Sequence, residues 1–448
     1  MERATHRVCS ENRLTVAVET LGCKVNQYES SYFLEVLKLA GYGIVPFRER
    51  ADIYIVHSCA VTAKAGFQTR QLLRRARRAN PDAMVVAAGC YAQLEGDRIA
   101  EEKLATHVLG NPSKFNLLDW LKRTGSFERP CVALDGPPRS CSEFEILPVS
   151  RMHTGRTRAT LKIQDGCDSF CSYCVVPHVR GRSRSLPADM VLSQMDRFLS
   201  AGYREIVLTG IHLGKWGKDL DPQLNLSHLL EKIGSSSRRP VRLRLSSLEP
   251  EECDPGLLEF VASAPWICRH FHIPLQSADP EILARMRRPY GPQNFTRLVA
   301  KIHSLFPYAA IGTDVLTGFP GETEKQFENT LAFIAGLPLS YLHVFPFSPR
   351  PGSPAAGFSG RIQGSELKRR AAVLQTMGRQ KKRAFLEKFI GECLDVLIET
   401  EVKPGLWEGL SNNYIRMLVT AVEAECPVEP IPVKVTGFNG KNLEGTPV

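Results

Sequence analysis

The 448-residue sequence has no apolar run long enough to cross a bilayer, and its first residues, Met1 to Arg13, are polar. We therefore expect no membrane anchor and no secretion signal, and we expect the protein to be cytoplasmic. Thirteen cysteines in so long a chain are too sparse for a disulfide scaffold. In a reducing compartment, clustered thiols are more often metal ligands. The composition, 43% hydrophobic and 23% charged, is typical of a soluble globular protein of two or three domains.

Acidic residues are scarce relative to basic ones, except at the C-terminal end. The chain carries a formal net charge of +10, but residues 389–448 contain four Lys/Arg and nine Asp/Glu, which gives that segment −5 and the rest of the chain +15. This excess positive charge indicates a polyanionic partner. One predicted helix, residues 64–78, is especially basic, and its arginines form either a solvated helix face or an RNA backbone contact; they are Arg70, Arg74, Arg75, Arg77 and Arg78.

The densest group of cysteines lies in the middle of the chain. Cys167, Cys171 and Cys174 follow a strand-like run, residues 159–163, and their spacing lets three thiolates wrap one compact metal centre. A structural zinc site normally takes four protein ligands, whereas a four-iron cubane capped by three cysteines keeps one iron open. The alternatives are incidental or buried cysteines, or a zinc loop completed by His178 or by a distant cysteine.

The first third of the chain repeats a unit made of an apolar strand, a cysteine and a helix. The strands are predicted at 15–18, 53–56 and 84–87, and the helices near 27–39, 64–78 and 96–103. Such alternation predicts a parallel sheet, in which ligands bind at the carboxyl ends of the strands. Cys23, Cys59 and Cys90 each follow such an end, so they form either a second three-thiolate site or three ordinary core cysteines.

Six further strand-helix units are predicted between residues 157 and 383, which indicates an incomplete relative of the eight-unit barrel with its chemistry at the strand ends. The strands are expected at 159–163, 205–209, 242–245, 271–275, 311–316 and 341–345, with helices near 187–200, 227–233, 255–262, 295–306 and 324–335.

The last part of the chain has a different pattern. A basic helix at 366–388 is followed by short β-type runs at 393–399, 406–410, 414–420 and 431–436, and these runs predict a small closed or nearly closed antiparallel barrel. Between the first two regions, residues 125–150, with Cys131 and Cys141, are expected to be a linker, and we assign these two cysteines no role.

Three motifs together carry a resemblance to a known family. The stretch from Thr20 to Ser30, reading TLGCKVNQYES, followed by Cys59 and Cys90, resembles the N-terminal domain of the methylthiotransferase family. The loop DGCDSFCSYC is similar to the signature of radical S-adenosylmethionine enzymes, and SNNYI at 411–415 resembles the RNA-binding TRAM barrel. The family usually has Asn-Thr-Cys at the second cysteine, where this chain has HSC at 57–59.

The resemblance spans residues 13–448 and implies an α/β protein of three domains. These are an N-terminal methylthiotransferase domain with a parallel sheet (13–128), a radical S-adenosylmethionine domain with a partial (βα)6 barrel (150–382) and a TRAM barrel (383–448). It also implies two 4Fe-4S clusters, with S-adenosylmethionine cleaved at one to a 5′-deoxyadenosyl radical and sulfur inserted from the other. The implied cluster ligands are Cys167, Cys171 and Cys174 for the radical cluster and Cys23, Cys59 and Cys90 for the auxiliary cluster, and the implied S-adenosylmethionine contacts are Thr209, Gly210, Ser246, Ser247, Gln276 and Asp314.

Among the branches of the family, the two cysteine motifs look most like the branch that modifies N6-threonylcarbamoyladenosine next to the tRNA anticodon. A base in a hairpin loop can be splayed out and held in a pocket at modest cost. The implied partners are therefore the tRNA anticodon stem-loop and a reduced flavodoxin- or ferredoxin-type electron donor, with no membrane and a monomeric chain. The alternatives are a methylthiotransferase for isopentenyladenosine or for ribosomal protein S12, and a metal-containing RNA-binding protein without catalytic activity.

Overall fold

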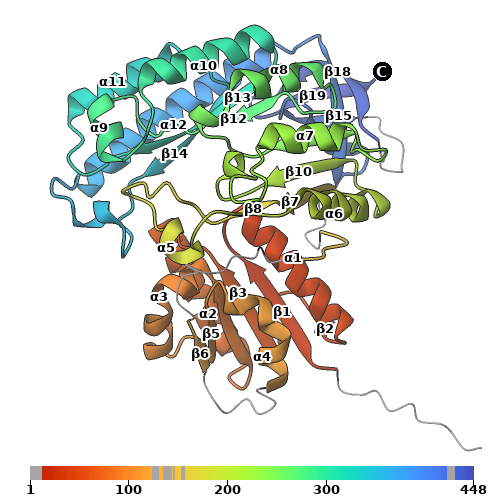
Figure 1. Ribbon diagram of the computed structural model, residues 1–448, viewed down its shortest axis with the longest axis vertical. Coiled ribbons are helices and arrows are strands. Elements are labelled where there is room, and N and C mark those ends of the chain that lie inside the picture. The colour runs from red at the N-terminus through yellow and green to blue at the C-terminus, as the bar shows by residue number, and fades with distance from the viewer. Residues whose placement is uncertain (1–12, 124–130, 135–143, 145–146, 153–156, 421–428) are drawn as a thin grey trace, which may run out of the picture. The chain divides into compact units, whose positions relative to one another are not determined.

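The computed structural model describes residues 13–123, 131–134, 144, 147–152, 157–420 and 429–448. The chain folds into two compact units, residues 1–139 and 140–448. The second unit contains both the partial barrel and the small closed barrel. Figure 1 shows the elements of each unit with their labels. No helix of the described residues is long and apolar enough to cross a membrane.

The first unit is built on a six-stranded sheet in which every neighbouring pair of strands is parallel. In spatial order the strands are β2 (Gly43–Ile44), β1 (Thr15–Thr20), β3 (Ile53–Ser58), β4 (Met84–Gly89), β5 (His107–Leu109) and β6 (Cys131–Ala133). The prediction that Cys131 lies in a linker is wrong, because this residue begins the edge strand β6, which pairs with β5. Cys141 lies outside the described residues.

Helices cover both faces of this sheet. The buried strands β3 and β4 alternate their side chains between the two faces, so that Ile53 and Ile55 point to one helical layer and Tyr54 and Val56 to the other. The first layer holds α1 (Lys24–Leu39), the 3-10 turn η1 (Ser113–Asn116) and α4 (Leu117–Arg123); the second holds α2 (Ala63–Ala79) and α3 (Cys90–Glu101). The predicted parallel-sheet domain with helices on both faces is confirmed (Figure 1).

The second unit begins with six strands in two parallel three-stranded sheets, ordered β11-β10-β7 and β12-β13-β14. Their bounds are β7 (Arg158–Lys162), β10 (Glu205–Thr209), β11 (Arg242–Leu245), β12 (His270–His272), β13 (Ala310–Thr317) and β14 (Tyr341–Pro346). The helices between them are α5 (Val176–Arg180), α6 (Ala188–Ser200), α7 (Leu226–Gly234), α8 (Pro255–Ser263), α9 (Pro280–Arg285), α10 (Pro292–Leu305) and α11 (Glu324–Ala335). The six predicted units are present, and the short helices α5 and α9 add to them. The long helix α12 (Gly364–Glu387) follows and packs along β14.

The chain ends in a closed five-stranded barrel, ordered β15-β16-β17-β19-β18. The strands are β15 (Cys393–Lys403), β16 (Leu406–Ser411), β17 (Arg416–Thr420), β18 (Ile431–Phe438) and β19 (Leu443–Pro447). The pairings are antiparallel except for β17 with β19, which is parallel. Leu386, in the last turn of α12, and Phe389, just after it, pack into the core of this barrel and so attach the end of the helix to the barrel.

A buried charge cluster joins the closed barrel to the partial barrel. Arg244 donates through Nε to Glu205 Oε1 at 2.7 Å, and its other nitrogens donate to the backbone carbonyls of Ser411 and Asn412. Arg242 donates to Asp395 Oδ2 at 3.1 Å and to Leu410 O. Because Glu205 is fully buried, its ionised carboxylate depends on these guanidinium groups for compensation.

Several acidic residues of the closed barrel are thus partners of arginines on the partial barrel. Asp395 pairs with Arg242, Glu399 with Arg158 at 2.6 Å, and Glu429 with Arg204. Glu423 and Glu425 lie outside the described residues. The negative charge of the C-terminal segment therefore serves, in part, to hold the closed barrel on its own chain.

We predict that Glu205→Gln destabilises the second unit by about 3–5 kcal/mol, because it leaves buried arginines without their counter-charge. Burial opposes ionisation of Glu205, but Arg244, Arg158 and Arg242 outweigh it and lower the pKa below its ordinary 4.5. The stabilisation is therefore present above pH 4.5 and is lost as the pH falls through the lower folded-state pKa. Denaturant unfolding at several pH values measures the free energy of unfolding of the variant. The control is Glu387→Gln, which removes the carboxylate of an exposed ion pair with Arg383. Equal stability of the two variants at neutral pH would contradict the prediction.

Candidate functional sites

The loop that carries Cys167, Cys171 and Cys174 is held by its own backbone and by one buried amide. Gly166 adopts a left-handed φ of +75°, and a Cβ at this position would lie 1.9 Å from the carbonyl oxygen of Arg182. The buried Gln164 donates to Asp165 O, Gly166 O and Ser183 Oγ and accepts from His212 N at 2.7 Å. The short pair β8 (Gln164–Asp165) and β9 (Arg184–Ser185) closes the loop. Only glycine fits the first turn, and Gln164 fixes the loop to the end of β10.

Each sulfur of this loop has a nearby nitrogen. The N–H of Ser169 donates to Cys167 Sγ at 3.4 Å, and the N–H of Val176 donates to Cys174 Sγ at 3.4 Å. Arg288 Nη1 lies 3.4 Å from Cys171 Sγ. Hydrogen bonds and positive charge of this kind stabilise thiolates that bind a metal. The three cysteines therefore share one compact, donor-rich loop.

The pKa values of the thiols differ with their surroundings. Burial raises the pKa of Cys174 to about 12. Burial also opposes ionisation of Cys167, but His212 and the N–H of Ser169 outweigh it and lower the pKa of that thiol. Burial likewise disfavours the charged form of His212, yet Cys167 and Glu252 raise its pKa to about 10. His212 Nδ1 lies 3.5 Å from Cys167 Sγ, and its Nε2 lies 2.6 Å from Glu252.

A polar cavity of about 620 Å³ opens beside this loop. Its lining joins the cysteine loop to the end of β10 and to the segment after α9, and it includes Asp168, Ser169, His212, Lys215, Glu249 and Arg288. The size and the mixture of charges suit a zwitterionic small molecule. Sequence reasoning missed Gln164 and Arg288, because both lie outside the motif and reach it only through the fold.

Most of the predicted S-adenosylmethionine contacts lie at or beyond the ends of parallel strands, whereas Asp314 lies within β13 (Ala310–Thr317). Thr209 ends β10 and is buried, and a Cβ on Gly210 would meet Gln164 at 2.9 Å. Ser246 follows β11, and its buried hydroxyl has no hydrogen-bond partner among the described residues. Gln276 has a left-handed φ of +64° and bridges to Val315 of β13. An unsatisfied buried hydroxyl beside the strand ends suits a residue that binds a ligand.

Ser247 and Asp314 belong to a polar cluster that also includes two histidines missed by sequence reasoning. Ser247 Oγ lies 2.6 Å from His272 Nδ1, while His272 Nε2 and His343 Nδ1 lie 3.0 and 3.2 Å from Asp314 Oδ1. Burial opposes ionisation of Asp314, but the two histidines outweigh it and lower the pKa to about 2. The three ligand atoms of His272, Asp314 and His343 lie within 4.8 Å of one another, so this set has the chemistry to hold a divalent cation or to orient a substrate.

In the first unit, the three cysteine-bearing loops meet at one edge of the sheet. Cys23 is the N-cap residue of α1, Cys59 follows β3, and Cys90 begins α3 directly after β4. The parallel register that pairs Thr20 with His57 and Ser58 with Gly89 brings these loops side by side. Asn26 joins two of them, since its amide donates to Leu21 O at 2.9 Å and to Ser58 O at 3.0 Å.

Two glycines permit this close approach. A Cβ on Gly22 would lie 2.7 Å from Cys59 Cβ, and one on Gly89 would lie 2.6 Å from the His57 ring. Both residues have a left-handed φ, +117° and +91°. The dense packing between adjacent loops is compatible with three thiolates that share one metal centre.

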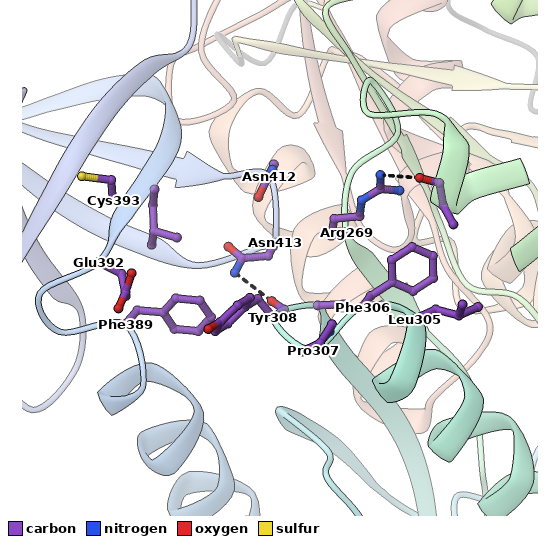
Figure 2. Close-up of a pocket in the computed structure, with 13 residues that line it drawn as sticks. Arg269, Leu305, Phe306, Pro307, Tyr308, Phe389, Glu392, Cys393, Asn412 and Asn413 are labelled. Carbon is purple, nitrogen blue, oxygen red and sulfur yellow. Dashed lines mark hydrogen bonds between the residues drawn. The ribbon is translucent and has the colours of Figure 1, made fainter. Parts of the chain in front are cut away.

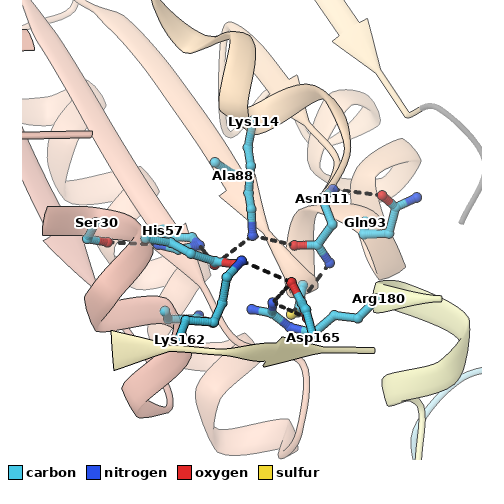
Figure 3. Close-up of polar contacts among 12 residues, drawn as sticks. Ser30, His57, Ala88, Gln93, Asn111, Lys114, Lys162, Asp165 and Arg180 are labelled. Carbon is cyan, nitrogen blue, oxygen red and sulfur yellow. Dashed lines mark hydrogen bonds and ion pairs between the residues drawn. The ribbon is translucent and has the colours of Figure 1, made fainter. Parts of the chain in front are cut away.

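A chain of buried polar side chains lies behind these loops (Figure 3). Asn111 Nδ2 lies 3.6 Å from Cys90 Sγ, and Lys114 Nζ donates to Asn111 Oδ1 at 2.8 Å and to Glu29 Oε2 at 2.7 Å. His57 Nε2 lies 3.4 Å from Glu29, and its Nδ1 lies 2.7 Å from Ser30 Oγ. Asn111 and Lys114 follow β5 at the same sheet edge as the cysteines, which is the signal that sequence reasoning overlooked.

Another cleft, about 430 Å³ in volume, lies between the partial barrel and the closed barrel (Figure 2). Asn413 spans it by donating to Tyr308 O at 3.0 Å, and the rings of Tyr308 and Phe389 lie 5.9 Å apart. The cleft is lined by no member of either cysteine triad. It marks the junction of the two barrels and lies apart from the cysteine chemistry.

We predict that Gly166→Ala prevents the central loop from holding iron, because the new Cβ would clash with the carbonyl of Arg182. Gly202→Ala is the matched control, since Gly202 also has a positive φ of +93° but has nothing within 4 Å of its Cβ position. Both variants strain the backbone, but only the first also meets a steric barrier. Iron analysis after anaerobic reconstitution compares them, and equal iron contents in the two variants would contradict the prediction.

Two regions of the chain match family models. Residues 15–110 match the uncharacterized protein family UPF0004, and residues 161–334 match the radical SAM superfamily. Among solved structures, the radical S-adenosylmethionine methyltransferase TsrM from Kitasatospora setae, with tryptophan substrate and a SAM analog bound, is similar in fold with a TM-score of 0.57. It has 17% identity, over 77% of this chain and 75% of that one. At this identity the likeness concerns the fold alone.

Sequence relatives are closer. The threonylcarbamoyladenosine tRNA methylthiotransferase MtaB of Bacillus subtilis is 34% identical over 91% of this chain and 91% of its own, and that of Thermotoga maritima is 36% identical over 90% of each chain. A tRNA-2-methylthio-N(6)-dimethylallyladenosine synthase of Symbiobacterium thermophilum is 30% identical over 99% of this chain and 96% of its own. With two cysteine triads, each beside the ends of parallel strands, and this similarity along nearly the whole sequence, the chain belongs to the methylthiotransferase family of radical S-adenosylmethionine proteins.

Proposed function

We propose that this protein is a tRNA methylthiotransferase that converts N6-threonylcarbamoyladenosine next to the anticodon into its 2-methylthio derivative. The observation that carries the proposal is the 34–36% identity to proteins of that name over about nine tenths of the chain, with both cysteine triads in place. The dimethylallyladenosine synthases are related at 30% identity. The substrate assignment follows the nearer relatives.

The residues divide into two sites with distinct roles. Cys167, Cys171 and Cys174 are assigned to the radical cluster, and Cys23, Cys59 and Cys90 to the auxiliary cluster. When bound, the clusters and S-adenosylmethionine supply the radical, the sulfur and the methyl group. The protein contributes the loop geometry fixed by Gly166 and Gln164, the donors to the sulfurs, and a polar pocket beside the radical site.

The strand-end residues are assigned to the small cofactor. Thr209, Gly210, Ser246, Ser247, Gln276 and Asp314 are the proposed S-adenosylmethionine contacts. Ser246 supports this role through its buried hydroxyl, which has no partner among the described residues. Asp314 is held by His272 and His343, so this carboxylate is fixed before any ligand arrives, and pre-organisation of this kind lowers the cost of binding.

The partners follow from the same assignment. The closed barrel, residues 383–448, is the proposed TRAM domain, and a reduced flavodoxin- or ferredoxin-type protein is the proposed electron donor. We assign the chain as a monomer in the cytoplasm.

On α12, Arg370 bonds to Glu322 at 2.9 Å and Arg369 pairs with Glu324 and Glu366, so part of this basic helix is already engaged within the chain. On α2, Arg74 pairs with Glu102 at 3.3 Å, and Arg75 and Arg78 are exposed, so this helix is the other candidate for RNA contacts.

We predict that cells without this protein lose 2-methylthio-N6-threonylcarbamoyladenosine from their tRNA and accumulate its precursor, N6-threonylcarbamoyladenosine. The wild-type chain should restore the product and Cys59→Ala should not, because the auxiliary site then lacks one ligand. Cys253→Ala, at a buried cysteine outside both triads, is the control and should restore it. Mass spectrometry of tRNA nucleosides measures all four strains. Loss of the dimethylallyl derivative instead would assign the chain to the other branch.

We predict that reversing the charge of Arg74, Arg75 and Arg78 flattens the salt dependence of tRNA affinity. These side chains are exposed on α2, and each phosphate that they no longer neutralise removes about 0.7–0.9 from the slope of log affinity against log salt. The matched control reverses Lys403, Lys434 and Lys441, which are exposed on the closed barrel and change the charge equally. Filter binding across a salt series compares them. A flattened slope in the control alone would place the RNA on the closed barrel.

A further inference from the structure

The polar chain behind Cys90 has more connections than a simple ion pair needs. Lys114 and Glu29 are 1% and 0% exposed, and the 2.7 Å distance between Nζ and Oε2 ties η1 to α1. Burying such a pair contributes little to stability, because the desolvation of both charges offsets their attraction. Lys114 also bonds at 2.8 Å to the carbonyl oxygen of Asn111, whose amide nitrogen faces Cys90 Sγ (Figure 3). The ammonium charge thus reaches the sulfur through one amide.

The direction of this hydrogen-bond chain determines its effect. A cation that donates to the oxygen of an amide withdraws electron density from it and strengthens the N–H groups as donors. Donation to a cluster sulfur favours the more negative, reduced state of the cluster, and it does so more strongly in a buried site. Lys114 donates to both Glu29 and Asn111, and Asn111 in turn donates to Cys90 Sγ, so the cationic member of the buried pair is the one linked to the sulfur.

We propose that Asn111, polarised by Lys114, is a positioning residue that stabilises the reduced state of the auxiliary cluster on Cys23, Cys59 and Cys90. The inference rests on the proposed function, which places a cluster at these cysteines. The three residues of the Asn111–Lys114–Glu29 relay are all residues of the first unit, as are the three cysteines of the sulfur-donating site.

The test uses the full-length chain with Cys167, Cys171 and Cys174 all changed to alanine, so that only the auxiliary site can hold iron. Asn111→Leu removes the donor at similar volume. The matched control is Asn80→Leu, because Asn80 is also a buried asparagine of this unit but bonds to Ala51 O at the opposite end of the sheet. A redox titration followed by electron paramagnetic resonance gives the midpoint potential of each reconstituted protein.

Asn111→Leu should lower the reduced-to-oxidised ratio at a fixed potential by on the order of tenfold, which corresponds to about 59 mV for a one-electron couple. Asn80→Leu should leave the midpoint unchanged. The double variant Lys114→Met with Glu29→Gln keeps the Asn111 amide but removes its polarisation, so it should shift the midpoint in the same direction by less.

Two results would overturn the inference, and they can be told apart. Midpoints of the Asn111 variant and the double variant equal to that of the control, at full iron content, would refute the relay and leave the proposed function standing. If Asn111→Leu fails to load iron, the midpoint potential of the Lys114→Met, Glu29→Gln variant is the test: a shift in the expected direction supports the relay, and a midpoint equal to that of the control refutes it. Absence of iron from the parent triple-alanine protein would refute the auxiliary cluster itself, and the relay with it.

Discussion

Parallel pairing of the strands is the constraint on which both sites depend. In the first unit, the register between β1, β3 and β4 sets the ends of three strands level, so that residues separated by more than thirty positions in sequence meet at one sheet edge. In the second unit, the same rule places Thr209 and Ser246 at the strand ends of the partial barrel, while Asp314 lies within β13. Both sites are formed at the edge where the carboxyl ends of parallel strands meet.

At these sheet edges, neighbouring segments of the backbone approach closely where a residue has no side chain, or where a buried polar side chain forms hydrogen bonds with both segments. Gly22, Gly89 and Gly166 each occupy a position at which a Cβ would collide with a neighbouring loop. Gln164 and Asn26 then replace the regular hydrogen bonds of a sheet by joining one loop to the next through their amides. Together these residues keep cysteines with very different sequence spacing in compact arrangements.

Buried charge recurs in both units and has two different purposes. Glu205 with Arg242 and Arg244 fastens the closed barrel to the partial barrel, and three carboxylates of the acidic C-terminal segment, Asp395, Glu399 and Glu429, also pair with arginines of the partial barrel. Glu29 with Lys114 leads to a cysteine sulfur through Asn111. Both arrangements require fully compensated charges, because an unpaired one would be too costly in the interior.

The sequence by itself indicated the parallel sheet of the first unit, the six strands of the partial barrel and a small closed barrel at the end of the chain, and it pointed to the two cysteine triads. Strand periodicity, cysteine spacing and turn residues are local signals, and the alternation of strands and helices restricts the topology to parallel sheets. It also predicted α11 to the residue and β10 likewise, because Thr323 caps the former and apolar residues fill the latter. The sequence did not predict the short strands β2, β5, β6, β8 and β9, nor β19; β2 and β6 are edge strands, and their pairing depends on the sheet already formed.

Only the tertiary structure decided which side chains surround each site. Arg288 reaches Cys171 from 117 positions away, and His272, Asp314 and His343 come from three different strands. Asn111 and Lys114 resemble ordinary loop residues until the end of β5 brings them behind Cys90. Such contacts depend on the register of the strands and on the direction of side chains across the whole sheet. No short stretch of sequence contains that information, because the residues in contact are far apart in the chain and only the fold brings them together.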